Sequence, residues 1–380
     1  MLFTTKTMSE WYSNYRGAVL ENILIEEVAT DSRRNTRNSL FIPLKGESFD
    51  GHEFLEDAIN NGAVATFWEL DKELPSFLPN NFPVFLVDDS LVALQQLASH
   101  YRNQVNPTVI GITGSNGKTT TKDLIGTVLQ SHYRTHRTKG NYNNHIGLPL
   151  TILSMKRDTE VLVLEMGMNH LGEIELLSKI ARPDYAVITN IGESHIEFLG
   201  SRNGIAQAKL EILTGLKKTG LLFIDGDEAL LTELHSRDNV MSVGFNSNNK
   251  YVISHFSSTE ADATFQLANQ TYKLNLLGRH NVKNASFAIL IAHELNVPFE
   301  KIKNSLVQLE ITGMRFEVTK GINNVTIIND AYNASPTSMK ASIDIVRDMD
   351  SRYKKVLVLG DMFEMGKHSR KLHQTVADSI

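Results

Sequence analysis

Apolar residues in the middle of the chain gather into short runs that alternate with helical patterns. Between the runs, apolar positions recur three and four residues apart, the spacing of one helix face. Runs that are apolar almost throughout are typical of strands buried on both sides, so the alternation predicts a mainly parallel sheet covered by helices, an α/β fold. Ligands bind such sheets at the carboxyl ends of the strands. The runs are TVIGIT at 108–113, VLVLEM at 161–166, YAVITNI at 185–191 and GLLFID at 220–225.

Shorter elements of the same kind precede this region. A helical pattern lies at 52–62, and a longer helix is expected at 90–104, just before Pro107. Together they predict a small α/β unit that ends near 100–106. Its strand-like runs are SLFIPL at 39–44, VATFW at 64–68 and FPVFLV at 82–87.

After the central region the pattern changes twice. Polar, strand-like segments fill 251–278, and helices are expected at about 281–295 and 298–309. From Gly313 the chain predicts the strands FEVTKG and NVTIIND, a helix beginning at SPTSMK, a strand KVLVLGD and a last helical pattern. We therefore expect three domains, listed by their bounds: 1–103, 104–312 and 313–380. The third has two or three strands and looks incomplete at its carboxyl end.

Composition narrows the function classes. The 380 residues carry a net charge of -5 with no basic block, which argues against nucleic acid binding. There is no cysteine, which excludes disulfides and metal-thiolate sites and fits the cytoplasm. Neither a signal peptide nor an apolar run of about 20 residues is present, so we expect no export and no membrane insertion.

The stretch GITGSNGKTTTKDL at 111–124 is the strongest candidate for chemistry. The usual phosphate-loop pattern G-x-x-x-x-G-K-[ST] requires glycine where this chain has Ile112. Gly114 and Gly117 nevertheless allow a tight turn between a strand and a helix, whose N-terminus favours anions. Lys118 would then reach the outer phosphates, and Thr119 would face Mg²⁺. The alternative is a glycine turn capped by threonines, with a solvated lysine.

Two further candidates lie at strand ends. Glu165 closes the run VLVLE, where a carboxylate can hold Mg²⁺ beside a phosphate loop. His195 comes after the strand at 185–191 and suits a metal ligand or a phosphate contact. Alternatively, both side chains are solvated. Lys209 lies in the helical pattern at 204–216 with Glu211 on a different face, so the residues alone indicate an ordinary surface lysine.

Several polar residues have two interpretations each. Asn281 either begins a helix or contacts a purine or ribose. Arg315 and Asp330 either bind phosphate and ribose hydroxyls or form surface ion pairs. The loop GNYNNHIGLPL at 140–150 is rich in amides, which suit a sugar or a pyrophosphate but are equally common in turns. Its candidates are Asn141, Asn143 and Asn144.

Taken in order, these segments resemble the Mur ligase family of ATP-dependent amide-forming enzymes. The resemblance implies three domains: an N-terminal UDP-substrate-binding domain, a central phosphate-loop ATPase domain and a C-terminal Rossmann-like domain. The segments that carry it are TGSNGKTTT at 113–121, GNYNNHIGLP at 140–149, EMGMNHLGEI at 165–174, TNIGESHIEFLGS at 189–201, AQAKLEI at 206–212, GRHNVKNA at 278–285, GMRFE at 313–317 and DAYNASPTSM at 330–339.

The resemblance also implies a reaction. Within the family, EMGMNHLGEI, DAYNASP and LVLGDMFEMG favour addition of D-alanyl-D-alanine to UDP-N-acetylmuramoyl-tripeptide in peptidoglycan precursor synthesis. ATP would phosphorylate the terminal carboxylate, and the amine would attack the acyl phosphate. Two Mg²⁺ ions and a monomeric enzyme are expected. Little acid–base chemistry is required, so positioning and charge neutralisation should dominate.

Individual roles are implied by the same resemblance. Lys209 matches a lysine that the family carbamylates, which overrides its interpretation as a surface residue. Lys118, His195 and Lys209 would be catalytic, and Thr119, Glu165, His195 and Lys209 would serve the metal ions. The remaining nucleotide contacts would be Thr113, Gly114, Ser115, Asn116, Gly117, Thr120, Asn281, Arg315 and Asp330. The substrate contacts would be Asp31, Ser32, Arg33, Asn141, Asn143 and Asn144.

Two other functions compete with this one. Another ligase of the superfamily, such as a folylpolyglutamate synthetase, shares the phosphate loop, but a folate enzyme begins near that loop and would lack the N-terminal segment TDSRRNTRNSLFIPLKGESFDGHEF at 30–54. A nucleotide-binding module without ligation chemistry is the second. A guanine switch would show N-K-x-D after a strand, and this sequence has none.

Overall fold

The computed structural model describes residues 2–259, 261–309, 312–349 and 354–380. By contacts the chain divides into two compact units, residues 1–107 with 141–160, and residues 108–140 with 161–380. None of the helices in these described ranges is long and apolar enough to cross a membrane.

The first unit is built on a five-stranded sheet in the order β2-β7-β6-β5-β4. Its inner strands are parallel, and only β2 runs antiparallel to its neighbour β7. Phe41, Leu55 and Trp68 lie in the core between the sheet and a helix. The elements are β1 Phe3–Thr4, α1 Thr5–Trp11, β2 Tyr15–Arg16, η1 Val19–Glu21, β3 Leu24–Ile25, β4 Glu27–Ala29, β5 Ser39–Phe41, η2 Gly51–Phe54, α2 Leu55–Asn60, β6 Ala63–Glu69, β7 Val84–Val87, α3 Ser90–Val105 and α5 Gly147–Leu153.

Residues 141–160 return to this unit although they come after the phosphate loop in the sequence. Helix α5 packs against α3. The Tyr101 hydroxyl donates a hydrogen bond to the Met155 carbonyl at 2.9 Å, and the Arg157 guanidinium donates to the Leu2 carbonyl at 2.6 Å. The asparagine-rich loop therefore begins a segment that packs with the N-terminal residues.

The second unit contains the predicted parallel sheet. Seven strands lie in the order β14-β13-β12-β11-β8-β10-β9, and every neighbouring pair is parallel. The register places Glu165 opposite Ile112, and Ile188 opposite Thr113, so three strands end at the same edge. The strands are β8 Thr108–Thr113, β9 Thr135–Arg137, β10 Val161–Glu165, β11 Tyr185–Ile188, β12 Leu221–Asp225, β13 Val240–Gly244 and β14 Tyr251–Val252.

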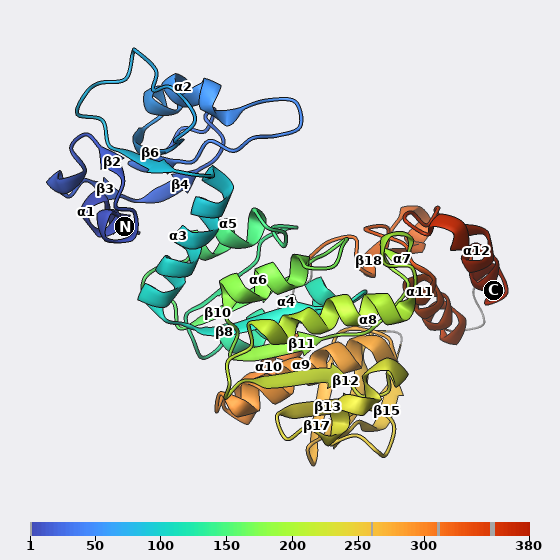
Figure 1. Cartoon of the computed structure of the whole chain (residues 1–380). Helices are drawn as coiled ribbons and strands as arrows, with labels where there is room; N and C mark the ends of the chain where they lie inside the picture. Colours follow the sequence, from blue (N-terminus) through green and yellow to red (C-terminus); the bar gives the residue numbers. More distant parts are fainter. Residues whose placement is uncertain (1, 260, 310–311, 350–353) are drawn as a thin grey trace. The chain divides into compact units, whose positions relative to one another are not determined.

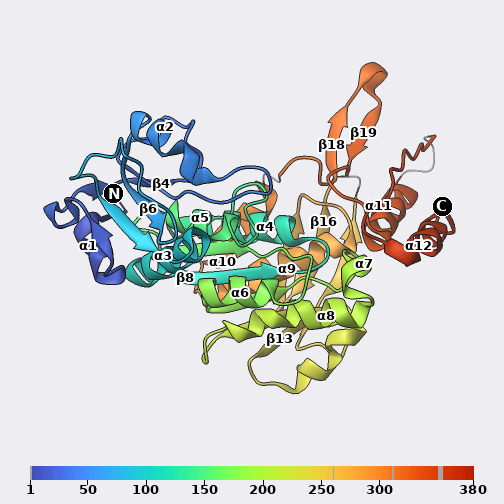
Figure 2. The ribbon, with the colours of Figure 1, turned by 45° about the horizontal axis from the view of Figure 1, so that its top comes forward.

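Helices cover both faces of this sheet, as Figures 1 and 2 show. On one face, α4 packs along α9 and α10, and on the other α6 packs against α8. An antiparallel sheet of β15, β16 and β17 adds apolar side chains to the same core. The bounds are α4 Lys118–Gln130, α6 Glu173–Ala181, α7 Ile196–Leu199, α8 Arg202–Leu210, η3 Glu211–Thr214, η4 Ala229–Ser236, β15 Ser254–Ser258, β16 Ala263–Leu267, β17 Gln270–Leu274, α9 Arg279–Glu294 and α10 Phe299–Val307.

The residues from 312 onwards confirm two of the predicted strands, which pair as a hairpin, and the predicted helices, but not the third predicted strand. The hairpin is antiparallel, and a Ser335–Ser338 capping box begins α11. The prediction of a strand at 355–361 is wrong, because no described strand lies beside this segment to share backbone hydrogen bonds. The elements are β18 Glu317–Lys320, η5 Ile322–Asn324, β19 Thr326–Asn329, α11 Pro336–Asp348, η6 Gly366–His368 and α12 Ser369–Ala377.

Candidate active site

The loop after β8 has the geometry of a phosphate-binding turn. Gly114 and Gly117 have φ angles of 150° and 78°, a range that favours glycine, and Gly117 is the N-cap of α4. A Cβ atom on Gly114 would lie 1.8 Å from the Thr189 hydroxyl oxygen, so a larger residue cannot fit. The amide of Asn116 donates to the Asn190 side-chain oxygen at 2.8 Å. The Asn190 side chain, just after β11, thus fixes the loop, a role that the sequence analysis did not assign to it.

Lys118 folds back over this loop. Its Nζ donates to the carbonyls of Gly114 at 2.7 Å and Ser115 at 3.3 Å. Burial lowers the pKa of Lys118, the charge of Glu165 opposes this shift, and the charge of Arg315 adds to it. Because the residue is half-buried and its ammonium group is held by neutral carbonyls, the interpretation as a solvated lysine is wrong. A phosphate would supply the negative charge that this cation lacks.

Several buried polar atoms of the loop have no hydrogen-bond partner in the described part of the chain. The loop contributes the Ser115 hydroxyl and the Asn116 side-chain nitrogen, and the strand before it and the helix after it contribute the hydroxyls of Thr113 and Thr121. Thr119 and Thr120 are also buried. Unpaired buried polar groups are costly, so these atoms fit a polar ligand such as a nucleotide phosphate.

Glu165 is buried at the end of β10, beside the strand that leads into the phosphate loop. The residue is 2% exposed, and its amide donates to the Thr138 hydroxyl at 3.0 Å. The interpretation of Glu165 as a solvated strand-end residue is therefore wrong. Its carboxylate raises the pKa of Lys118, which places the two charges in the same site.

His195 connects this site to the C-terminal residues. It adopts φ 64° at the start of α7, and its Nδ1 lies 2.5 Å from the Glu364 carboxylate. Burial lowers the pKa of His195, Glu364 opposes this effect, and Lys118 and Lys209 lower the pKa further. The side chain is only 20% exposed, so it is not the solvated histidine of the alternative interpretation. Sequence analysis did not detect Glu364 as its partner.

The interpretation of Lys209 as a surface residue is wrong. The residue is 2% exposed, and its side chain is one of the largest that are fully buried among the described residues. Burial lowers its pKa well below the ordinary value, and the charge of Lys118 contributes to the shift. Ile205, four residues earlier on α8, is fully buried. This helical spacing from an apolar residue was the signal that could have revealed the burial of Lys209.

The structure leaves the proposed metal ligands as a prediction. Within the described ranges, no three or more histidine, aspartate or glutamate side chains are grouped to hold a metal ion. Glu165 and Thr119 are buried at the sheet edge and offer oxygen atoms, which hard cations prefer. His195 contacts Glu364 through Nδ1, which leaves its Nε2 as the possible ligand atom.

The three remaining nucleotide candidates have different environments. Asn281 lies in the first turn of α9 and donates to the Leu277 carbonyl at 2.8 Å, whereas Gly278 is the N-cap. The interpretation of Asn281 as a plain N-cap is therefore wrong. The Arg315 guanidinium lies 4.1 Å from the ring centre of Tyr332. Asp330 is exposed and accepts hydrogen bonds from the Phe316 amide and the Ser342 hydroxyl.

The six expected substrate contacts belong to the first unit, whereas the phosphate loop belongs to the second. Asp31 forms an ion pair with Arg33 at 2.8 Å, and hydrogen bonds from Arg33 lower the pKa of Asp31 to about 2. Ser32 is buried, whereas Asn141 is exposed and Asn143 is half-buried. The Asn144 side chain accepts hydrogen bonds from the amides of Ile146, the N-cap of α5, and Gly147, its first residue.

Comparison with known proteins identifies the family. The Mur ligase family catalytic domain matches residues 24–102, the Mur ligase middle domain matches 112–292, and the glutamate ligase domain of Mur ligases matches 314–380. UDP-N-acetylmuramoyl-tripeptide--D-alanyl-D-alanine ligase of Bacillus subtilis (strain 168) is 50% identical over 93% of this chain and 77% of that protein. This chain belongs to the Mur ligase family.

Solved Mur ligases share its fold. A crystal structure of MurF from Acinetobacter baumannii matches with a TM-score of 0.87 and 30% identity, over 99% of this chain and 83% of the other. MurF ligase from Thermotoga maritima, in complex with ADP, matches with a TM-score of 0.85 and 30% identity, over 94% of this chain and 82% of that chain. The corresponding ligase of Escherichia coli (strain K12) is 33% identical over 94% of this chain and 79% of that protein.

Proposed function

We propose that this Mur ligase joins the amine of D-alanyl-D-alanine to the terminal carboxylate of UDP-N-acetylmuramoyl-tripeptide, with ATP converted to ADP and phosphate. The observation that carries this proposal is the pair of lysines at the sheet edge. Lys118 lies close enough to Lys209 for its charge to lower the pKa of Lys209, and Lys118 also senses the charge of Glu165. The positive charge of Lys118 suits a reaction in which phosphate and carboxylate charges must meet.

The reaction balances without a protein nucleophile. A carboxylate oxygen of the tripeptide attacks the γ-phosphorus of ATP, and the bond to the β-phosphate oxygen breaks to release ADP. The amine nitrogen then attacks the acyl carbon, the tetrahedral species expels phosphate, and the nitrogen loses a proton. During this sequence Lys118 exchanges its contacts with the loop carbonyls for phosphate oxygens. The amide groups at the start of α4 face the same charge.

We propose Thr119, Glu165, His195 and Lys209 as the residues that serve two Mg²⁺ ions. Bound Mg²⁺ would neutralise phosphate charge and polarise the γ-phosphoryl group. Thr119 and Glu165 are both buried and offer the oxygen ligands that this ion prefers. The Nδ1 of His195 contacts the Glu364 carboxylate, so Nε2 is the nitrogen that would serve the ion, with Glu364 orienting the ring.

Carbamylation of Lys209 is the corresponding proposal for the second lysine. CO₂ adds to an unprotonated amine, so that a nitrogen–carbon bond forms and one proton leaves. The lowered pKa of Lys209 favours the unprotonated amine, and the carbamate would replace this buried amine by a negatively charged group near Lys118. Lys209→Ala should lose activity and regain part of it with formate or acetate. Full activity of Lys209→Ala without these anions contradicts the proposal.

The other site assignments remain proposals on the same basis. We propose that Asn281, Arg315 and Asp330 contact the nucleotide together with residues 113–120, and that the six polar residues of the first unit contact the uridine substrate. We also propose a cytoplasmic monomer with domains at 1–103, 104–312 and 313–380. The lowered pKa of Lys118 beside Arg315 supports a phosphate role for Arg315.

The experiment that tests the function is ADP release with UDP-N-acetylmuramoyl-tripeptide, with and without D-alanyl-D-alanine. Tripeptides ending in lysine and in diaminopimelate should both be offered. We expect ADP release to require both substrates and the peptide product to gain the mass of the dipeptide minus water. ATP binding without ADP release would instead favour the nucleotide-binding module that does not ligate.

A further inference from the structure

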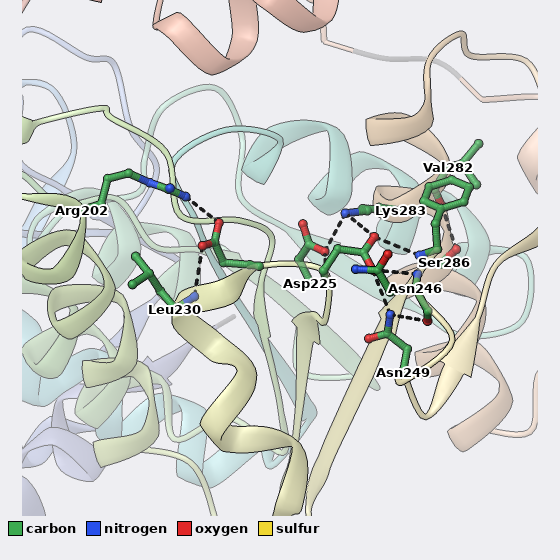
Figure 3. Close-up of polar contacts among 11 residues, drawn as sticks. Arg202, Asp225, Leu230, Asn246, Asn249, Val282, Lys283 and Ser286 are labelled. Carbon is green, nitrogen blue, oxygen red and sulfur yellow. Dashed lines mark hydrogen bonds and ion pairs between the residues drawn. The ribbon is translucent and has the colours of Figure 1, made fainter.

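An acidic segment lies after β12 at the carboxyl edge of the central sheet. Asp225, Asp227 and Glu228, here called the acidic clasp, lie in the residues that leave this strand. Figure 3 shows that basic side chains from two helices contact them, Arg202 from α8 and Lys283 from α9. These two helices also carry Lys209 and Asn281 of the candidate active site.

Lys283 bridges two carboxylates of the clasp. Its Nζ lies 2.7 Å from Asp225 Oδ1 and 2.8 Å from Asp227 Oδ2. All three side chains are less than 20% exposed, with fractions of 18%, 11% and 16% respectively. Buried ion pairs seldom stabilise a protein more than apolar residues of the same size would. They do hold their side chains in one defined geometry.

Asp227 is held from the opposite side as well. It accepts hydrogen bonds from the amides of Phe245 at 2.9 Å and Asn246 at 3.0 Å, and from the Asn249 side chain at 2.9 Å. Burial alone would raise the pKa of Asp227, but Lys283 and these amides outweigh it and lower the pKa to about 2. The clasp is therefore a charged anchor between the β13–β14 loop and α9.

Arg202 makes the second connection. Its Nη2 donates to the Glu228 carboxylate at 2.8 Å and to the Ile191 carbonyl at 2.7 Å. Ile191 lies in the loop that carries His195, and Arg202 is the first residue of α8. The clasp thus joins the histidine loop to the start of the helix that carries Lys209.

On the α9 side, the connection reaches the phosphate loop. Lys283 immediately precedes Asn284, which is buried and donates from its side chain to Asn281 Oδ1 at 3.3 Å. A Cβ atom on Gly117 would lie only 2.9 Å from the Asn284 side-chain oxygen. A shift of the first turns of α9 would therefore be transmitted directly to the turn that precedes Lys118.

We propose that the acidic clasp positions the starts of α8 and α9 around the nucleotide, and that Lys283 is a positioning residue for nucleotide affinity. Its relevance to catalysis rests on the proposed ligase function. Lys283 is not expected to touch the reacting atoms, since both of its ion pairs are to the clasp. Its loss should weaken nucleotide binding more than it slows the bound complex.

The test compares Lys283→Met with a matched control, Lys217→Met. Lys217 also forms a 2.8 Å ion pair with an aspartate, Asp184, but this residue precedes β11 at the opposite edge of the sheet. We expect Lys283→Met to raise the dissociation constant of ADP and the KM for ATP by about tenfold, with kcat within about threefold of the unmodified chain. Lys217→Met should leave both binding values within about twofold. Lys283→Arg should recover most of the affinity.

Thermal unfolding of each variant separates positioning from loss of folding. If Lys283→Met does not fold, the double variant Lys283→Met/Asp225→Asn removes one uncompensated carboxylate and should show the same loss of affinity. A folded Lys283→Met chain that binds ADP within twofold of the unmodified chain overturns the proposal. The proposal is also overturned if Lys283→Met lowers kcat about tenfold and leaves the KM for ATP unchanged.

Direct ADP binding requires neither the muramoyl substrate nor the dipeptide. An unmodified chain that binds ADP without turnover would refute the ligase function and leave the clasp testable by binding. An active ligase whose Lys283→Met variant keeps its affinity would refute the clasp alone.

Discussion

The tetrapeptide VLVL occurs twice in the second unit, with opposite outcomes. At 161–164 it forms most of β10, between β8 and β9, and all four residues are buried. At 356–359 it forms no strand, and Val356 and Val358 are 72% and 93% exposed. Identical local preference therefore does not decide whether a strand forms.

The difference lies in the neighbours. β10 has a parallel strand on each side to share backbone hydrogen bonds, and helix α4 packs on it. Segment 356–359 has no strand beside it among the described residues. The acidic residue after each copy differs in its environment too, since Glu165 is buried next to Lys118, whereas Asp361 is exposed and contacts His373.

The largest expected effect is on folding. Val163→Asp places a carboxylate in the central sheet and should destabilise the second unit by more than about 4 kcal/mol, because the charge has neither water nor a partner there. Val358→Asp should change the free energy of unfolding by less than about 0.5 kcal/mol. Chemical denaturation of both variants checks this. Equal destabilisation would show that the second copy is buried in solution.

The next largest effect is on catalytic activity. It compares Glu165 and Asp361, the acidic residues that come after the two VLVL segments. Glu165→Gln keeps the shape but removes the charge beside Lys118, so kcat should fall at least about 100-fold. Asp361→Asn loses an exposed contact to His373 and should keep kcat within about threefold. Steady-state ADP release measures both values. A Glu165→Gln variant with near-normal kcat would remove Glu165 from the site.

The smallest expected effect is a gain in thermal stability on replacing Lys209 by methionine, and this gain should depend on pH. The folded chain favours the neutral amine of Lys209, whereas the unfolded chain protonates it at its ordinary pKa. Folding therefore releases a proton, and stability falls as the pH drops below about 10. In buffer freed of CO₂, Lys209→Met should raise Tm by about 2–4 °C at pH 7, with a smaller gain near pH 10.

Lys355→Met is the matched exposed variant for this measurement. Lys355 Nζ contacts the carbonyls of Arg347 and Met349 at the surface, so its replacement should give no pH-dependent gain. A pH-independent change in Lys209→Met would mean that the amine is protonated in the folded chain.

Much of the fold could be predicted from the sequence because the central strands carry their own burial signal. The phosphate loop was also predictable, since strand, glycine turn, lysine and helix are contiguous. The prediction of a strand at 355–361 was wrong, because an apolar run does not report whether a neighbouring strand is present. The contact between His195 and Glu364 joins distant residues, and no local pattern indicates it.

Lys209 shows a different kind of limit. The residues alone indicated a surface lysine, whereas Ile205, four residues earlier, shares the buried face of α8. The acidic clasp could not be predicted from the sequence either. Its acidic residues come after one strand and their basic partners lie on two helices, and the fold of the sheet brings them together.

Transfer of ¹⁸O tests the central claim most directly. The terminal carboxylate of UDP-N-acetylmuramoyl-tripeptide is labelled with ¹⁸O, and phosphate released in the presence of ATP and D-alanyl-D-alanine is examined by mass spectrometry. If the carboxylate attacks the γ-phosphoryl group, one phosphate is released for each ADP formed. Each of these phosphates carries one ¹⁸O atom from the carboxylate. Unlabelled phosphate released together with ADP would contradict ligation through an acyl phosphate.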